Sequence, residues 1–356
     1  MTSIPRIGYV PFTPTLKAPG DWRRFVAYAR ARNLKFELAR FDQRYDVVVL
    51  SEIADISIWS DYREGKVAFD LIDSYLSVPR TNWRQFLRGP LWFALGRHRR
   101  LKDYLSSLRE MCRRADAVVC TTDEQKKMIG AYCNNVHVIL DIHSMVVTEI
   151  KTQYSAGRPF RLAWEGLPSN LTQLATVAPV LRRLSKQQDF ELHVISDPGR
   201  SRNPYGLGFF DSQRFLARHF DRAHFHAWKE DSCSRILASC DLAIIPIDLN
   251  DRFVTGKPEN KLLLQWRIGL PVVAAATPAY RRAMQEVGTP EFACENDTQW
   301  IEALEKMMGS ELIRKEAATC GRLYAESEHG AAATIARWDA MFTSLGFSFG
   351  DGQKSD

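Results

Sequence analysis

The chain has 356 residues, of which 45% are hydrophobic, 25% charged and 11% aromatic, and its formal net charge is +6. This composition is typical of a globular protein with enough apolar material for two cores, and it excludes disordered, collagen-like and coiled-coil chains. No apolar run approaches the about 18–20 residues that cross a bilayer, and the first residues lack a secretory signal pattern, so we expect neither a membrane span nor export. The seven cysteines form no C-x-x-C pair, which favours reduced thiols in a cytoplasm.

Short β-branched runs alternate with longer amphipathic stretches over about residues 4–145 and again over about 160–300. Such alternation predicts βαβ units and parallel sheets whose strands are covered on both faces. The predicted strands of the first half are 6–10, 35–38, 46–50, 66–69, 117–120 and 136–140. Those of the second half are 161–164, 191–196, 223–226, 242–247, 271–276 and 291–293.

Helical periodicity separates these strands and then takes over completely after residue 297. The predicted helices include 170–184, 234–240, 261–268, 280–288, 312–328 and 331–345. The mostly polar stretch 149–159 carries a Gly and ends in Pro, as a linker would. We therefore predict two domains, 1–153 and 154–356, with the terminal helices crossing back to the first domain.

Several common site signatures are absent from the sequence, among them the P-loop, the H-E-x-x-H pattern, the G-x-S-x-G elbow and G-x-G-x-x-G after the first strand. His224 and His226 alternate along one strand and would point to the same face. Because no third metal ligand accompanies them, a structural pair is the favoured interpretation.

The informative stretch runs from residue 240 to residue 280. A buried strand at 242–247 opens a polar loop that carries Arg252 and Lys257, and a helix is predicted to begin at Pro258. This order places cations and free helix N–H groups at the carboxyl edge of a parallel sheet, where a diphosphate can bind. The competing interpretation is that the charges around Lys257 are only a solvated helix start.

Three runs of this stretch, DLAIIP at 241–246, KPENKLL at 257–263 and GLPVV at 269–273, resemble the nucleotide-sugar-binding segment of GT-B glycosyltransferases. More narrowly, they resemble the retaining, family-4-like enzymes of bacterial surface-polysaccharide synthesis. ADAVV at 115–119 together with 136–140 is similar to the end of the N-terminal domain of that fold, and 160–184 to the first βα unit of its C-terminal domain.

The resemblance implies an α/β GT-B fold: two Rossmann-like domains with parallel sheets facing an interdomain cleft, and a helical C-terminal end. The first domain would take the acceptor and the second the nucleotide sugar. The residues it implies for donor and phosphate binding are Arg252, Lys257, Glu259, Asn260, Lys261, Ser169 and Asn170, the last two also starting a helix.

The sequence departs from the family pattern at two positions. Many relatives carry a pair of glutamates there, the second of which binds the ribose; Gly256 and Leu264 stand in their places. Glu259 is the nearest carboxylate. The absence of the two glutamates leaves open a donor of another class, such as a CMP-linked acid.

Further candidate catalytic and acceptor-binding residues lie at strand ends. For each of them the alternative is a purely structural role in a turn or as a helix cap. Glu165 would end the first strand of the second domain, and Asp70 and Asp73 follow a strand of the first, where one of them could orient an acceptor hydroxyl or accept its proton. Asp21 completes the set of catalytic candidates. Next to it, Arg23 and Arg24 could meet the acceptor.

The segment 80–114 is strongly basic, with ten lysines and arginines against two acids, and aromatic side chains lie between them. Basic charge with aromatic anchors suits an anionic membrane surface, where a lipid-linked acceptor would be presented. The alternatives are a nucleic acid, for which no recognised module is present, and aromatics that face the core beneath solvated arginines. The contact residues we predict are Trp83, Arg84, Arg88, Trp92, Arg97, Arg99 and Arg100.

These observations favour a cytoplasmic, metal-independent glycosyltransferase with no cofactor, working on a glycan or lipid-linked glycan at the inner face of the membrane and not on nucleic acid. The alternatives are a nucleotide-sugar epimerase of the same fold, a non-catalytic glycan-binding module and a basic peripheral scaffold.

Overall fold

The structure is a computed structural model that describes residues 5–78, 83–143, 146–199, 201–202 and 209–349. The chain divides into two compact units. Unit 1 comprises Met1–Ile142, Gly256–Pro258 and Ala331–Asp356, and unit 2 comprises His143–Thr255 and Glu259–Gly330. The division after Ile142 falls earlier in the chain than the linker expected at 149–159. No helix among the described residues is long and apolar enough to cross a membrane.

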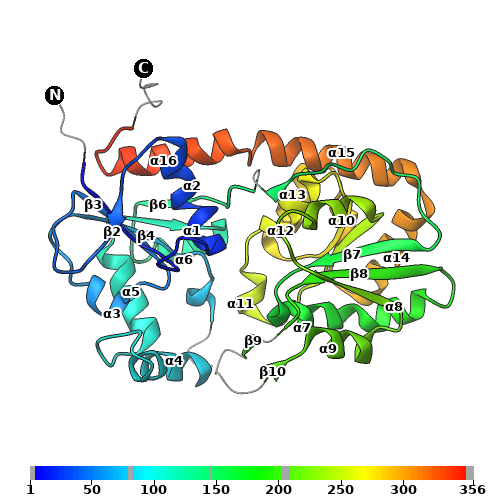
Figure 1. The fold of residues 1–356 in the computed structure, drawn as a ribbon, viewed down its shortest axis with the longest axis horizontal. Coiled ribbons are helices and arrows are strands. Elements are labelled where there is room, and N and C mark those ends of the chain that lie inside the picture. The colour runs from blue at the N-terminus through cyan, green and yellow to red at the C-terminus, as the bar shows by residue number, and fades with distance from the viewer. Residues whose placement is uncertain (1–4, 79–82, 144–145, 200, 203–208, 350–356) are drawn as a thin grey trace. The chain divides into compact units, whose positions relative to one another are not determined.

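Unit 1 is built on a six-stranded sheet in the order β2-β1-β3-β4-β5-β6, and every neighbouring pair is parallel (Figure 1). Strands β3 and β5 are completely buried, and β4 is buried after its first residue, as the nearly continuous apolar runs predict. Its strands are β1 (Ile7–Val10), β2 (Glu37–Leu38), β3 (Val47–Ser51), β4 (Lys66–Asp70), β5 (Ala117–Cys120) and β6 (Val136–Val138).

The helices of unit 1 follow its strands, as parallel crossovers require. They are α1 (Pro19–Trp22), α2 (Phe25–Ala31), α3 (Ile56–Trp59), η1 (Tyr75–Ser77), α4 (Trp83–Ala94), α5 (Tyr104–Arg114), α6 (Asp123–Ile129) and, from the far end of the chain, α16 (Ala331–Ser344).

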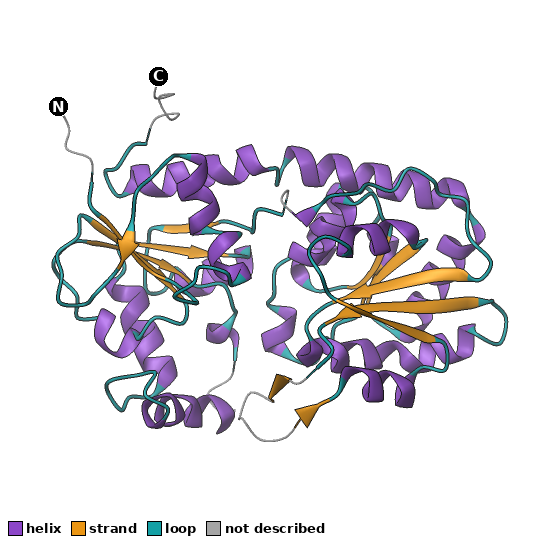
Figure 2. Cartoon of the chain, viewed as in Figure 1, coloured by secondary structure: helices purple, strands orange, loops and turns teal. Residues whose placement is uncertain are grey.

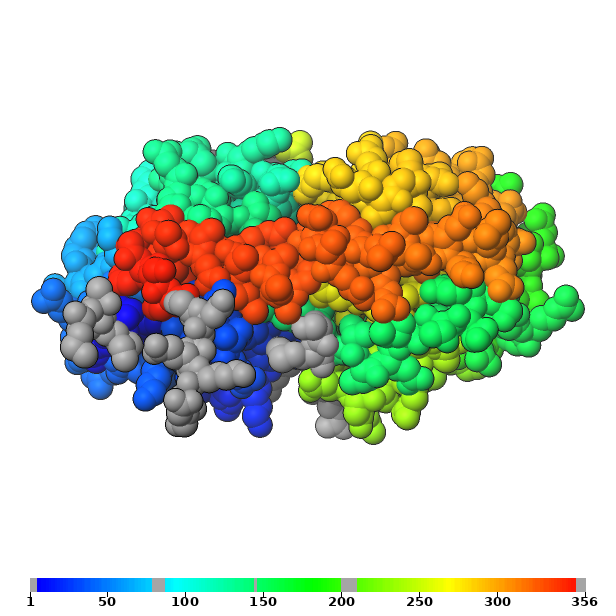
Figure 3. Space-filling model, turned by 90° about the horizontal axis from the view of Figure 1, so that it is seen from above, coloured from blue at the N-terminus to red at the C-terminus, as the bar shows by residue number. Residues whose placement is uncertain are grey.

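The C-terminal helix α16 packs on the core of unit 1. The ring of Phe342 stacks on Tyr28 with centroids 5.3 Å apart, and Trp338 is fully buried in the same cluster. The Asp339 carboxylate accepts hydrogen bonds from the Tyr28 hydroxyl at 2.9 Å and from Arg32 Nε at 3.1 Å. In the space-filling view, the red α16 lies beside the blue and teal segments of this unit (Figure 3).

Unit 2 repeats the architecture, with a six-stranded parallel sheet in the order β11-β8-β7-β12-β13-β14 and helices on both faces (Figure 2). The strands are β7 (Phe160–Glu165), β8 (Phe190–Ser196), β11 (Ala223–Ala227), β12 (Leu242–Ile245), β13 (Val272–Ala275) and β14 (Ala293–Cys294). A separate antiparallel pair joins β9 (Ser201–Arg202) to β10 (Phe209–Phe210).

The helices of unit 2 include a long α15 that packs against α12. They are η3 (Pro168–Asn170), α7 (Leu171–Leu174), η4 (Ala175–Val177), α8 (Ala178–Leu184), α9 (Ser212–His219), α10 (Cys233–Ser239), α11 (Arg252–Thr255), α12 (Asn260–Arg267), α13 (Pro278–Glu286), η5 (Pro290–Phe292), α14 (Asp297–Gly309) and α15 (Glu311–Ser327).

The α/β class with two parallel sheets is confirmed, but two helix predictions were wrong in detail. The stretch 170–184 is broken into η3, α7, η4 and α8, because Pro179 lacks a backbone N–H and can stand only in the first turn of a helix. The helix expected from Pro258 begins at Asn260 with Glu259 as its N-cap. A short additional helix, α11, occupies part of the predicted loop.

Candidate functional site

The carboxyl edge of the unit 2 sheet joins residues from strand β7 and helix α12. Lys261 Nζ donates a hydrogen bond to the backbone oxygen of Glu165 at 2.9 Å and lies 5.1 Å from the centroid of the Trp164 ring. A Cβ at Gly166 would lie 2.5 Å from that Nζ and 2.8 Å from the Trp164 ring, so a side chain there would displace the lysine. The glycine is therefore required for this close approach.

Glu259 lies at the same edge as the N-cap of α12. It is 6% exposed, and its side chain makes no capping hydrogen bond to the helix. Tyr280, on the neighbouring helix α13, is fully buried, and burial raises its pKa, helped by the charges of Glu259 and Glu165. The charges of both carboxylates therefore act on Tyr280, and Lys261, in the first turn of α12, contacts the backbone of Glu165.

The loop after β12 is held by its own polar side chains and by Gln173 of α7. The backbone N–H of Asp248 donates to Gln173 Oε1 at 2.6 Å, and the Asp248 carboxylate accepts from the N–H of Asn250 at 3.0 Å. Asp251 accepts from the N–H of Phe253 at 2.9 Å in the first turn of α11. These bonds fix the loop that leads to the cationic residues.

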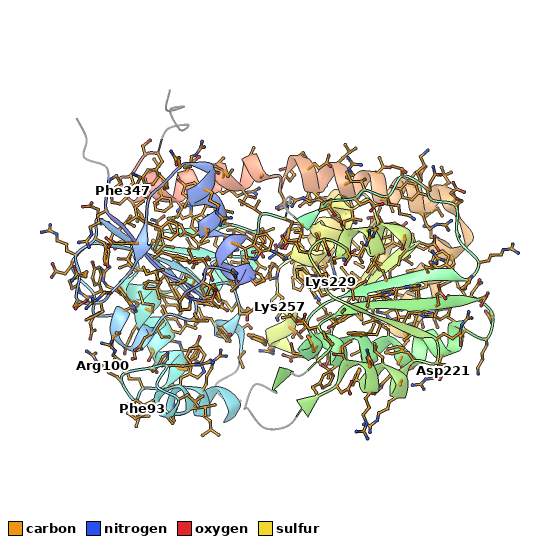
Figure 4. All side chains as sticks on the ribbon, in the orientation of Figure 1. Phe93, Arg100, Asp221, Lys229, Lys257 and Phe347 are labelled. Atoms are coloured by element: carbon orange, nitrogen blue, oxygen red, sulfur yellow. The ribbon has the colours of Figure 1, made fainter. Side chains whose placement is uncertain are left out.

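The predicted phosphate-binding cations do not all fall in one unit. Arg252 is exposed at the start of α11, and Lys257 lies between α11 and α12 (Figure 4) and is grouped with unit 1. Asn260 and Lys261 belong to unit 2. An exposed lysine that sequence analysis missed, Lys229, follows β11 at the carboxyl edge of the unit 2 sheet (Figure 4).

Ser169 and Asn170 do not cap the following helix through their side chains, contrary to expectation. Both belong to the 3-10 turn η3, and Asn170, at the N-cap of α7, makes no side-chain capping bond. Ser169 is exposed and follows β7 by a few residues, which leaves it at the same sheet edge as Glu165.

Asp21 organises the loop after β1. It is fully buried, and its carboxylate accepts hydrogen bonds from the Tyr9 hydroxyl and the Phe12 N–H at 2.7 Å each, and from the N–H and hydroxyl of Thr13 at 3.0 and 3.1 Å. With four donors already bound to its oxygens, this carboxylate has a structural role here.

Arg24 and Asp70 form a buried ion pair. Arg24 is fully buried; its Nη2 and Nε donate to the two Asp70 oxygens at 2.6 and 2.8 Å, and its Nη1 donates to Asp141 at 3.0 Å. The prediction that Arg24 meets the acceptor or a membrane is therefore wrong, because its guanidinium is enclosed in the core. The Asp70 carboxylate is likewise occupied there by Arg24. Arg23 is half-buried, with its guanidinium 4.8 Å from the Trp22 ring.

Asp73, the other carboxylate predicted after β4, has an unexpected neighbour. Its backbone N–H donates to Glu52 Oε2 at 2.8 Å, and Glu52 directly follows β3, the strand beside β4. Burial raises the pKa of Glu52 to about 8, and the negative charge of Asp73 adds to the shift. Sequence analysis missed Glu52; only its place directly after a buried strand could have indicated it.

The predicted contact residues of the basic segment 80–114 differ in how deeply they are buried. Trp92, predicted to meet a membrane, faces inward, with its ring 4.9 Å from that of His98 and 5.1 Å from that of Tyr104. Arg88 is half-buried. The side chains of Trp83 and Arg84 lie outside the described part of the structure. The exposed members are Arg97, Arg99 and Arg100, with Leu87, Phe93, Leu95 and Leu101 as exposed apolar neighbours.

His224 and His226 belong to a larger hydrogen-bonded group on the β8–β11 edge. His193 Nδ1 lies 2.9 Å from His226 Nε2, and the Glu191 carboxylate lies 2.9 Å from His193 Nε2 and 3.1 Å from His224 Nε2. Among the described residues, no group of three or more histidine, cysteine or acidic side chains has the geometry to hold a metal ion. Hydrogen bonding accounts for this arrangement.

A cavity of about 800 Å³ lies at the opposite end of the unit 1 sheet, where β3, β4 and β5 begin. Its wall includes Asp46, Lys66 and Asp116, and the last two form an ion pair at 2.9 Å. Ligands of open α/β sheets bind at the carboxyl ends of strands, so this cavity is not our candidate site.

Comparison with solved structures gives the fold. WaaG, a glycosyltransferase involved in lipopolysaccharide biosynthesis, superposes with a TM-score of 0.55 at 14% identity over 96% of this chain and 100% of that one. Sucrose-phosphate synthase from Thermosynechococcus elongatus superposes with a TM-score of 0.59 at 12% identity, over 90% of this chain and 76% of that one. TarM gives 0.57 at 9% identity over 83% and 54%, so the chain spans about half the length of that protein. No family model and no curated protein matches the sequence.

The chain has a GT-B-like fold. This chain has two six-stranded parallel sheets and a helical C-terminal end, and its likeness to these proteins is one of structure alone. At such low identity the likeness carries the fold and not the substrates, because function depends on the particular side chains of a site.

Proposed function

We propose that this chain is a glycosyltransferase that moves a sugar from a nucleotide-activated donor to a glycan or lipid-linked glycan in cell-surface polysaccharide synthesis. The observation that carries the proposal is the carboxyl edge of the unit 2 sheet. There Glu259 and Lys261 stand at the start of α12, and Lys261 binds the backbone oxygen of Glu165 at the end of β7, within a GT-B-like fold. Such an edge suits a nucleoside diphosphate.

The chemistry follows from the charge that develops on the donor. When the bond between the anomeric carbon and the phosphate oxygen breaks, that oxygen gains negative charge. The acceptor oxygen bonds to the same carbon, and its proton passes to the departing phosphate oxygen. Lys261, Lys257 and Arg252 would stabilise the phosphate together with the N–H groups of α12. A reaction of this kind, with the acceptor entering on the face that the phosphate leaves, retains the configuration of the sugar and needs no metal.

Glu259 is the carboxylate we assign to the donor's hydroxyl groups. It stands at the N-cap of α12 and is nearly buried, while Leu264, one turn further along the same helix, has only an apolar side chain. S. aureus TarM was solved with UDP. We therefore place uridine nucleotides first among the donors to be tested.

The acceptor is assigned to unit 1, whose exposed surface around α4 is basic and apolar. Arg97, Arg99 and Arg100 occur beside exposed Phe93 and Leu95. Phe93 and Arg100 both lie at the end of unit 1 that carries α4 (Figure 4). Cations beside apolar side chains suit an anionic lipid surface. We propose that this face meets the membrane that presents the acceptor.

Thermal unfolding with a panel of UDP-, GDP-, TDP- and CMP-linked sugars and free nucleotides, without metal, tests the donor assignment. A ligand at 100 times its Kd stabilises the folded state by about 2.7 kcal/mol, a Tm rise of roughly 5–10 °C for a unit of this size. One nucleotide family should give the shift, and Lys257→Ala should weaken its binding at least tenfold. Lys186→Ala, at an exposed lysine of unit 2 that follows α8, is the matched control.

A non-catalytic glycan-binding module is the second candidate, because Gly256 and Leu264 replace the carboxylates that many relatives carry. Release of nucleotide that depends on an added acceptor supports the transferase. Nucleotide binding without release, across donors and acceptor glycans, supports the module. Turnover of the donor without any acceptor indicates an epimerase or hydrolase, and no shift with any nucleotide contradicts the donor site itself.

A further inference from the structure

Unit 1 contains a buried polar cluster, here called the Glu52 cluster, formed by Glu52, Asp73, Tyr75, Arg88 and Tyr104. Glu52 follows β3 and Asp73 follows the adjacent parallel strand β4, so both side chains start from the same carboxyl edge. The N–H of Asp73 donates to Glu52 Oε2 at 2.8 Å, which fixes one oxygen and leaves Oε1 for another partner. Glu52 is 9% exposed, and Asp73 is half-buried.

The cation of this cluster is held by aromatic rings. The Arg88 guanidinium lies 4.0 Å from the centroid of Tyr75 and 4.6 Å from those of Trp92 and Tyr104. Its Nη2 donates to the Tyr75 hydroxyl at 2.8 Å. Cation–π contacts in such a partly buried place hold a guanidinium firmly. Arg88 therefore supplies a fixed positive charge close to Glu52. Burial by itself would lower the pKa of Arg88, but the charges of Tyr104, Tyr75 and Glu52 outweigh burial and raise it.

Two buried hydroxyls lack a hydrogen-bond partner among the described residues: that of Tyr104, in the Glu52 cluster, and that of Ser74, next to Asp73 in the chain. The Tyr104 hydroxyl and Ser74 Oγ are buried, at 0% and 1% exposure of their residues, and make no hydrogen bond within the described part of the structure. The charges of Glu52 and Asp73 help to raise the pKa of Tyr104, so its hydroxyl lies within their field. Buried hydroxyls are nearly always hydrogen-bonded, so the unpartnered Tyr104 hydroxyl, in the field of the two carboxyl groups, indicates a polar partner at this place.

The protonation state of Glu52 follows from its surroundings. Burial raises its pKa to about 8, and Asp73 and Asp70 act in the same direction, while Arg88 and the Asp73 N–H oppose the shift. At neutral pH the side chain is therefore a carboxylic acid. A carboxylic acid donates one hydrogen bond, which a carboxylate cannot do.

We propose that Glu52 and Asp73 together bind one hydroxyl group of the carbohydrate acceptor. Glu52 donates a hydrogen bond to the hydroxyl oxygen, and Asp73 accepts a hydrogen bond from the hydroxyl group. This inference rests on the proposed function and adds to it a named binding residue and the form in which it works. The ligand class is a neutral sugar hydroxyl, because the pair offers one donor and one acceptor.

The pH dependence of the KM for the acceptor tests this assignment. The probes are the methyl glycosides of glucose, galactose, mannose and N-acetylglucosamine, with the donor that stabilises the protein, and nucleotide release is followed from pH 6 to 9.5. For the wild type, KM should rise about thirtyfold between pH 7 and pH 9.5, as the acid form of a group with pKa about 8 disappears.

Two substitutions separate this role from a structural one. Glu52→Gln keeps a donor and an acceptor; its KM should stay within about threefold of the wild type at pH 7 and then remain flat with pH. Glu52→Ala should raise KM at least tenfold at pH 7. Glu110→Gln, at a partly exposed residue of α5 in the same unit that pairs with Lys102, is the matched control and should follow the wild-type profile.

The pH dependence of stability checks that the acid form exists. A carboxyl whose pKa is higher in the folded state than in the unfolded state loses stability as pH rises from about 4.3 towards about 8, and not outside that window. The Tm of wild type relative to Glu52→Gln should therefore fall across this range and level off above it. Parallel Tm curves would overturn the inference.

Failure of this inference and failure of the proposed function give different results. Transfer that occurs with the same KM profile in wild type and Glu52→Gln overturns the inference and leaves the transferase intact. If no donor turns over, saturation-transfer NMR of the same glycosides decides it. A signal that Glu52→Ala abolishes supports the hydroxyl site, and an unchanged or absent signal overturns it.

Discussion

Single charged residues in unit 1 differ sharply in what they contribute, because burial decides how strongly water screens them. The Arg24–Asp70 pair has side chains that are 0% and 4% exposed, whereas Arg40 and Asp42 are 72% and 62% exposed. Breaking a buried pair leaves an unpaired charge in a medium of low dielectric constant, while an exposed pair is replaced by hydration. The same bidentate contact therefore has different consequences at the two places.

Removing Arg24 should destabilise the protein strongly. We expect Arg24→Ala to lower the free energy of unfolding by about 3–5 kcal/mol, because the Asp70 and Asp141 carboxylates then lose their cation. Arg40→Ala, the exposed control, should cost at most about 1 kcal/mol. Urea unfolding at pH 7 measures both. Equal effects of the two variants would contradict the assignment of Arg24 to the core.

At the scale of elements, helix α4 and the segment after it have two roles. Some of their aromatic and basic residues pack in the core, and others lie on the surface. Trp92 and Arg88 pack inward against Tyr104, while Leu95 and Leu101 are 61% and 62% exposed. An amphipathic helix buries one face, as α4 does with Arg88 and Trp92, and the segment that follows α4 exposes apolar side chains between cations. That pattern is what we expect of a surface that rests on anionic lipid.

Binding to vesicles tests this surface. Replacing Arg97 and Arg99 with Gln should weaken binding to vesicles that contain phosphatidylglycerol by about thirtyfold, since each cation near such a surface adds about 1 kcal/mol. Leu95→Ala should also weaken binding, whereas Leu323→Ala, which is equally exposed but lies on α15 in unit 2, should not. A sedimentation assay with neutral vesicles as reference gives the numbers. Binding that is indifferent to the arginines would argue against a membrane face.

At the scale of the whole molecule, two units have the same architecture, and the proposed function assigns the donor to one and the acceptor to the other. Each sheet brings its candidate residues to the carboxyl ends of its strands: Glu165 and Lys261 in unit 2, Glu52 and Asp73 in unit 1. This follows from parallel connections, which place all loops after strands at one edge. Donor and acceptor functions therefore need only one site in each unit.

Hydrogen exchange across the whole chain should distinguish the two sites. With the stabilising nucleotide at 100 times its Kd, amides at the start of α12 and after β7 should exchange up to about 100-fold more slowly, because their opening competes with binding. Amides of β3 and β4 in unit 1 are the internal reference. Protection confined to unit 1 would move the donor to the other sheet.

The sequence by itself determined the βαβ rhythm, most strand positions, the polar segment after β12 and the class of fold, because these depend on residues close together in the chain. The nearly continuous apolar runs of β3 and β12 are read directly from the sequence. The roles of individual polar residues were not open to such reading. Only the tertiary structure buried Arg24 and turned Trp92 inward.

The Glu52 cluster and the histidine group were likewise decided by tertiary structure. Glu52 gains its raised pKa from burial and from Asp73, which follows the neighbouring strand, and His193 meets His226 through the pairing of β8 with β11. Contacts between residues far apart in the chain depend on which strands are neighbours and on how deeply each side chain is covered. Periodicity along the chain carries neither kind of information, and the structure supplies both.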